Sequence, residues 1–103
     1  MNKQIKIYVE YTIEESAIPQ YQMLIKQIVE ALEHFEAQSI ECYKTEKQDQ
    51  FMEIFTVPTE SHFHAIKRIH KNKNHTVFGK LHRIVSGGAD QISCRALVQS
   101  KQS

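Results

Sequence analysis

One segment constrains the fold more than any other, an amphipathic helix predicted over Gln20–Phe35. Its apolar residues recur with the 3.6-residue period of a helix that buries one face. They are Tyr21, Leu24, Ile25, Ile28, Val29, Leu32 and Phe35. A single helix of this length is marginal in water, so its apolar face must pack against other elements. Alternating segments on either side of the helix predict that a β-sheet covers it.

Apolar and polar residues alternate with a period of two in four segments, which predicts four strands. They are Ile5–Ile13, Ser39–Thr45, Phe51–Val57 and Ile92–Gln99. A short polar link, residues 46–50, predicts a hairpin between the second and third strands. In the first strand we expect the odd-numbered residues to meet the helices and the even-numbered residues to face away.

Cap residues and apolar spacing mark where the helices begin and end. Ser16 is the expected N-cap of the long helix, with Pro19 in its first turn. A second helix follows Pro58, with Thr59 or Ser61 as its cap. Its predicted buried stripe consists of Phe63, Ala65, Ile66 and Ile69, while Lys67, Arg68, His70 and Lys71 lie elsewhere on its surface. A short third helix over residues 77–85 ends before Gly87-Gly88.

This order of elements predicts one α+β domain over residues 1–103. The expected architecture is ferredoxin-like, βαββαβ, with a four-stranded antiparallel sheet and both main helices on one face. The strands carry aromatic residues in both phases of their alternation, so the face away from the helices is partly apolar. A large exposed apolar face marks an interface or a ligand groove. We therefore expect a homodimer joined through its sheet faces.

Composition limits the classes of partner. The formal net charge of +1 creates no general attraction for nucleic acid or an anionic membrane. No apolar run approaches the ~20 residues of a membrane span, and the chain starts directly in a strand, so a cytoplasmic protein is expected. The basic run Lys67–Lys73 fits a solvated helix end. Cys42 and Cys94 are expected to be reduced and structural, and the six histidines lack zinc-site spacing, so no metal is predicted.

The element order and apolar positions resemble those of the dimeric α+β barrel superfamily, and within it the antibiotic-biosynthesis-monooxygenase-like group. The resemblance covers nearly the whole chain. It is carried by the strand Ile5–Ile13, the helix Gln20–Phe35, the hairpin Ser39–Val57 with Phe51-Met52-Glu53-Ile54-Phe55, the helix after Pro58-Thr59, and the segment Val77–His82. Members of that superfamily pair their sheets into a barrel and hold small organic ligands between sheet and helices. Some oxidise aromatic polyketides without a cofactor, and some degrade heme.

The segment Val77-Phe78-Gly79-Lys80-Leu81-His82 is similar to the part of the heme-degrading members that supplies the axial histidine. The resemblance therefore makes His82 a candidate iron ligand, because a neutral imidazole is a sound axial ligand. Those members also use an asparagine on the first strand and a tryptophan in the second helix. This chain has Tyr11 or its neighbour Glu10 at the strand position and no tryptophan. We therefore expect no cofactor, with heme as the alternative.

Charged residues within strands are the remaining candidates for chemistry. Glu53 shares its strand face with Phe51 and Phe55, and a carboxylate in an apolar cleft is the kind of group that acts as a base. Glu53 and Arg95 could pair or bind a polar ligand group in such a cleft, or they could form an ion pair or polar rim at the dimer interface. The candidate catalytic residues are Glu53, Tyr11 and His82. The candidate ligand-binding residues are Tyr8, Glu10, Tyr43, Phe55, Phe78 and Arg95.

Three functions follow in order of preference. The first is a homodimeric barrel that binds a small apolar or aromatic molecule and, if it is an enzyme, is a cofactor-independent monooxygenase. The second is a non-catalytic ligand-binding or interaction module on the same fold. The third is heme binding or degradation through His82.

Overall fold

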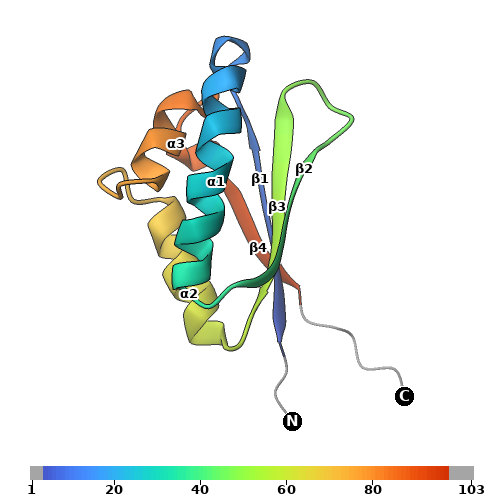
Figure 1. The fold of residues 1–103 in the computed structure, drawn as a ribbon, viewed down its shortest axis with the longest axis vertical. Helices are drawn as coiled ribbons and strands as arrows, with labels where there is room; N and C mark the ends of the chain where they lie inside the picture. The colour runs from blue at the N-terminus through green and yellow to red at the C-terminus, as the bar shows by residue number, and fades with distance from the viewer. Residues whose placement is uncertain (1–3, 98–103) are drawn as a thin grey trace.

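The structure is a computed structural model that describes residues 4–97. Figure 1 shows one antiparallel sheet with all the α-helices packed on one of its faces. The elements are β1 (Ile5–Thr12), η1 (Glu15–Ala17), α1 (Ile18–His34), β2 (Gln38–Lys44), β3 (Gln50–Val57), α2 (Glu60–His70), α3 (Phe78–Ile84), η2 (Ala89–Gln91) and β4 (Ser93–Leu97). The strand order is β2-β3-β1-β4. The predicted α+β, ferredoxin-like arrangement is confirmed.

The register of the central strands fixes which side chains meet the helices. Val9 on β1 lies opposite Glu53 on β3 and opposite Cys94 on β4. Cys42 on β2 lies on the other side of Glu53. Paired residues share a face of the sheet, so these four side chains form one row beneath the helices.

Burial alternates along β1 and β3 as the sequence predicts. Ile7, Val9 and Tyr11 are buried beneath the helices, and so are Phe51, Glu53, Phe55 and Val57. The even-numbered residues between them point to the opposite, open face. That face carries the half-exposed Tyr43 and Leu97, so the prediction of apolar groups on both faces is confirmed.

The helix boundaries differ from prediction mainly at the start of α1. A 3-10 turn, η1, precedes the helix, and the N-cap residue Ala17 makes no side-chain cap bond. The prediction of Ser16 as N-cap is therefore wrong, although Pro19 does lie in the first turn. For α2, Thr59 accepts a hydrogen bond from the His62 backbone N–H at 3.3 Å and is the cap. The predicted residues Val98 and Gln99 of the last strand lie outside the described residues.

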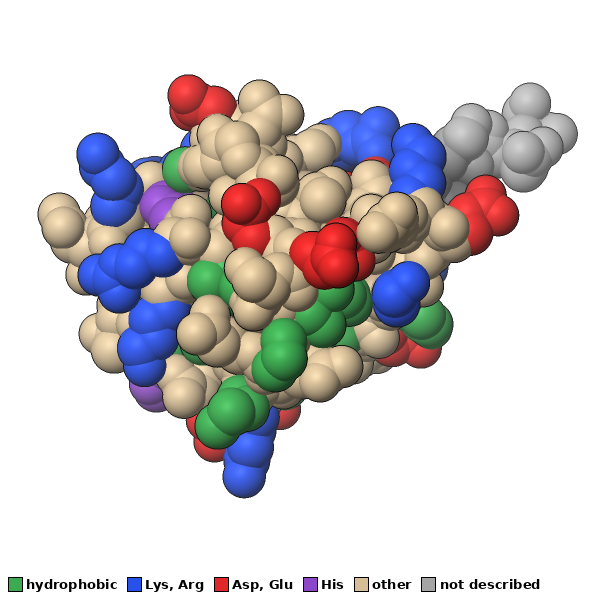
Figure 2. Space-filling model, turned by 90° about the horizontal axis from the view of Figure 1, so that it is seen from above, with side chains coloured by type: hydrophobic (Ala, Val, Ile, Leu, Met, Phe, Trp, Pro, Cys, Tyr) green, Lys and Arg blue, Asp and Glu red, His purple; other side chains and the backbone are tan. Residues whose placement is uncertain are grey.

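The outer surface of α2 bears out the interpretation of the basic run. Lys67, Arg68 and Lys71 are exposed near the helix C-terminus, where cations complement the helix dipole. Seen from above, several Lys and Arg side chains project from the side of the molecule on which the helices lie (Figure 2).

Within the described part of the chain, no helix is long and apolar enough to cross a membrane.

Candidate acid–base site

Four ionisable side chains form a continuous hydrogen-bonded chain between the sheet and the helices. The hydroxyls of Tyr21 on α1 and Tyr11 on β1 are 2.9 Å apart. The Tyr11 hydroxyl donates to Oε2 of Glu53 on β3 at 2.5 Å. Nε2 of His70 on α2 lies 3.0 Å from Oε1 of the same carboxylate. All four are buried, and Glu53 and His70 have no exposed surface at all.

Simple periodicity places each member of this chain. Tyr11 and Glu53 occupy inward positions on adjacent strands, and Tyr21 lies on the buried stripe of α1. His70 follows Ile66 by four residues and Phe63 by seven, so it belongs to the buried stripe of α2. The expectation that His70 lies on the helix surface is therefore wrong. The spacing from Phe63 and Ile66 could have revealed it, but the surrounding lysines and arginine suggested an exposed segment.

The direction of the hydrogen bonds in this network follows from the groups that can act only as acceptors. Nδ1 of His70 lies 2.9 Å from the Ile66 carbonyl oxygen, which only accepts, so Nδ1 carries a proton. The Tyr11 proton is directed to Glu53, so the bond between the two tyrosines is donated by Tyr21. Both oxygens of Glu53 thus take part in hydrogen bonds with protein groups.

The tyrosines and cysteines around Glu53 stay neutral near pH 7. Burial, followed by the negative charge of Glu53, raises the pKa of Tyr11 well above its usual value. Burial is also the main reason that the pKa of Tyr21 is raised. Burial and then the charge of Glu53 raise the pKa of the Cys42 and Cys94 thiols to about 11. Both cysteines are free, as predicted, and these pKa values keep them as inert thiols.

His82, the third candidate catalytic residue, contacts the backbone of His70. Among the described residues it forms no hydrogen bond with Glu53. Its Nε2–H donates to the His70 backbone carbonyl at 2.5 Å, which ties α3 to the end of α2. Its Nδ1 is buried and has no hydrogen-bond partner among the described residues. Phe78, at the start of α3, packs against the His70 ring with centroids 4.2 Å apart.

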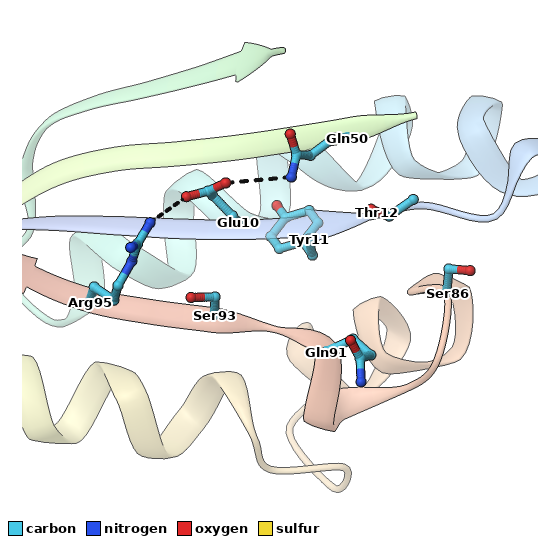
Figure 3. Close-up of a pocket in the computed structure, with 8 residues that line it drawn as sticks. All are labelled: Glu10, Tyr11, Thr12, Gln50, Ser86, Gln91, Ser93 and Arg95. Carbon is cyan, nitrogen blue, oxygen red and sulfur yellow. Dashed lines mark hydrogen bonds and ion pairs between the residues drawn. The ribbon is translucent and has the colours of Figure 1, made fainter. Parts of the chain in front are cut away.

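The predicted pairing of Glu53 with Arg95 is wrong, because the two side chains lie on opposite faces of the sheet. Arg95 lies opposite Tyr8 on the open face and donates to Oε1 of Glu10 at 2.7 Å. Figure 3 shows this ion pair beside Gln50, whose amide contacts the other Glu10 oxygen at 3.4 Å. The pair lines a polar hollow of about 520 Å³.

The predicted ligand-binding residues therefore divide into two groups. Phe55 and Phe78 are buried between sheet and helices, on the same side as Glu53. Tyr8, Glu10, Tyr43 and Arg95 lie on the open face. Among the described residues, no group of three His, Cys, Asp or Glu side chains is arranged to hold a metal ion.

Neither a family model nor a curated protein matches this chain by sequence, whereas solved structures do match its fold. An antibiotic biosynthesis monooxygenase superposes with a TM-score of 0.68 at 14% identity, covering 94% of this chain and 99% of the other. A conserved protein of unknown function from Bacteroides thetaiotaomicron, described as a possible oxidoreductase, has a TM-score of 0.67 at 12% identity and covers 96% and 100%.

A dimeric ferredoxin-like protein from an uncultured marine organism has a TM-score of 0.62 at 9% identity and covers the whole of both chains. At these identities the likeness concerns the fold. The chain therefore shares its fold with these structures, among them an antibiotic biosynthesis monooxygenase and a dimeric ferredoxin-like protein.

Proposed function

We propose that the protein binds a small apolar or aromatic molecule between its sheet and helices and uses Glu53 as the base in a cofactor-independent oxygenation. The observation that carries the proposal is the Glu53 carboxylate, which has no exposed surface and is hydrogen-bonded to Tyr11 and His70. The similarity in fold to an antibiotic biosynthesis monooxygenase supports this class of reaction.

Burying a network of this kind costs desolvation free energy, and the hydrogen bonds and charge interactions that it forms offset little more than that cost. Replacing a buried ion pair by apolar side chains of similar volume is often neutral or stabilising. Four connected ionisable groups in the core of a 103-residue domain therefore suggest a role other than stability. Burial raises the pKa values of two members of the network, Tyr11 and Tyr21, and perturbed ionisable groups gathered at one place are typical of acid–base sites.

The proposed chemistry balances with oxygen as the oxidant. Glu53 removes a proton from a methylene group that a neighbouring hydroxylated aromatic ring makes acidic, and the carbanion combines with O₂ to give a peroxide anion. Protonated Glu53 returns the proton, and the hydroperoxide loses water. A CH₂ group and O₂ thereby become a carbonyl group and H₂O, and the carboxylate is regenerated. Tyr11, held as a neutral phenol, orients the carboxylate.

We also propose that two chains pair through their open sheet faces. Tyr43 and Leu97 are each 48% exposed on that face, beside the partly exposed Tyr8, Met52 and Ile54. Pairing two such faces would bury their apolar groups, and one fold neighbour is described as dimeric.

Oxygen uptake with a panel of hydroxylated quinone precursors tests the proposed reaction. We expect uptake by the natural protein and a loss of at least about 100-fold in Glu53→Gln, the lower end of the range for a general base. Glu33→Gln, which alters an exposed carboxylate on α1, is the matched control and should leave uptake unchanged. Binding without Glu53-dependent uptake would instead indicate the non-catalytic ligand-binding module.

A hemin titration tests the alternative cofactor. An axial ligand must direct a lone pair at the iron, but His82 Nε2 donates to His70 and Nδ1 is buried. We therefore expect no Soret band that depends on His82. A saturable shift that His82→Ala abolishes would replace the oxygenase proposal with heme binding.

A further inference from the structure

We infer that His70 is a positioning residue, held in the core as an imidazolium that keeps the Glu53 carboxylate ionised. Its usefulness to catalysis rests on the proposed role of Glu53 as a base, whereas its protonation state does not. The sequence pattern did not indicate this role, because His70 was expected on the surface of α2.

The hydrogen bonds of His70 leave two placements for one proton. Nδ1 donates to the Ile66 carbonyl in either case. The proton between Nε2 and Glu53 Oε1, which are 3.0 Å apart, can belong to the imidazole or to the carboxyl group. The first placement gives an imidazolium and a carboxylate, and the second gives a neutral imidazole and a carboxylic acid.

The other oxygen of Glu53 distinguishes the two placements. Tyr11 donates to Oε2 at 2.5 Å. A hydrogen bond donated to a carboxyl oxygen stabilises the ionised form of the group. The bond from Tyr11 therefore favours a carboxylate, which places the shared proton on His70.

The other ionisable groups around the pair do not supply the balancing positive charge. Tyr11 on β1 and Tyr21 on α1 are neutral phenols. Cys42 on β2 and Cys94 on β4 are neutral thiols. His75, before α3, has its pKa lowered by burial and then by His70, so it is neutral near pH 7.

Among the described residues, the remaining charged and titratable neighbours make no hydrogen bond or ion pair with the carboxylate. Lys67 and Lys71 are exposed on α2, and their charges are felt at Cys94. His82 on α3 contacts the His70 carbonyl, not the imidazole. The His70 ring is therefore the cation in contact with Glu53.

This arrangement also sets the charge balance of the proposed reaction. When Glu53 accepts a proton from the substrate, a C–H bond breaks, the carboxylate becomes neutral and the imidazolium remains. Its positive charge then balances the new carbanion.

NMR of the ¹⁵N-labelled full chain tests the protonation state directly. At pH near 7 we expect bonded protons on both ring nitrogens of His70, visible because the ring is sealed from solvent. In Glu53→Gln the positive charge has no counter-ion, so the Nε2 proton should be lost while the Nδ1 proton remains. A natural protein with no proton on Nε2 would overturn the inference.

A second measurement tests the role of His70 without depending on whether one variant folds. The variants are His70→Gln, Glu53→Gln and the double variant, each unfolded in urea. A charged pair predicts that both single variants lose stability and that the double variant recovers much of the loss. Additive losses would contradict the ion pair.

Kinetics separate this inference from the proposed function. If the oxygenase reaction is found, His70→Gln should move the acidic limb of the rate–pH profile to higher pH, which a purely structural role would not do. An unmoved limb would refute the positioning role. If both ring protons are present but no Glu53-dependent reaction exists, the proposed function fails and the ion pair stands.

Discussion

Gly79 shows how closely the loop before α3 packs on that helix. A Cβ atom added to Gly79 would lie 2.4 Å from the Lys73 carbonyl oxygen, which belongs to backbone and cannot rotate away. Gly79→Ala should therefore destabilise the protein by about 1–3 kcal/mol, the usual cost of overpacking. Urea unfolding measures the change, with Arg83→Ala on the exposed side of the same helix as the control. Equal stability of the two variants would contradict the close approach.

The cap of α2 gives a second prediction for single residues. Thr59 accepts the His62 N–H, so Thr59→Ala should cost about 1 kcal/mol, as typical N-cap losses do. Ser61, which the sequence offered as the alternative cap, is exposed within the helix. Ser61→Ala should accordingly be close to neutral in the same urea experiment. The reverse order of the two losses would show that the cap has been misassigned.

The face of the sheet on which a residue lies was predictable from the sequence where a single strand determined it. Alternation alone placed Glu53 on the face it shares with Phe51 and Phe55, and Tyr11 on the inward side of β1. The pairing of Glu53 with Arg95 failed because it depends on the phase of β4 relative to β3. These strands do not touch, and only their separate registers with β1 fix that phase.

At the scale of an element, α3 depends on an unusual cap. It has only seven residues, and Nδ1 of His75 accepts hydrogen bonds from the backbone N–H groups of Val77 and Phe78 at 3.1 and 3.2 Å. Nδ1 can accept them only while it is unprotonated. Burial, and then the charge of His70, lowers the pKa of His75 below 6.5.

The resulting pH dependence has a definite sign. A lowered pKa in the folded state means that the unfolded chain binds the proton more readily. The stabilisation from the cap is therefore fully present above pH 6.5 and is lost as the pH falls through the lower folded-state pKa. Protection of the Val77 and Phe78 amides from hydrogen exchange should therefore decrease as the pH falls through this pKa.

Substitution of His75 tests this dependence. His75→Asn cannot titrate in this range and should remove the pH dependence of the two amides. His34 is exposed on α1 and lines a surface groove together with His75. His34→Asn should therefore retain the pH dependence of the two amides. Identical profiles for the natural protein and His75→Asn would exclude the histidine cap.

The elements themselves were largely predictable from periodicity, including their order and the side of the sheet that the helices cover. The start of α1 was not predictable, because the 3-10 turn η1 precedes Ile18 and no side chain caps the first turn of the helix. His70 was missed for a related reason: its position on the apolar stripe was outweighed by the charge of its neighbours.

At the scale of the whole molecule, the open face predicts self-association. Light scattering should give a mass near twice 12.0 kDa for the natural chain. Ile54→Glu places a charge among the apolar residues of that face and should shift the mass toward that of a single chain. Met23→Glu, at an 80% exposed position on α1, is the matched control and should leave the mass unchanged. A monomeric natural protein would refute the sheet-to-sheet pairing.

The most direct test of the account asks whether the buried network serves stability or function. In one variant, Tyr11 and Tyr21 become Phe, and Glu53 and His70 become Leu. The variant should be at least as stable in urea as the natural protein, because apolar side chains of similar volume replace a costly buried ion pair without leaving a polar group unpaired. A loss of several kcal/mol would contradict the account and make the network a structural feature of the core.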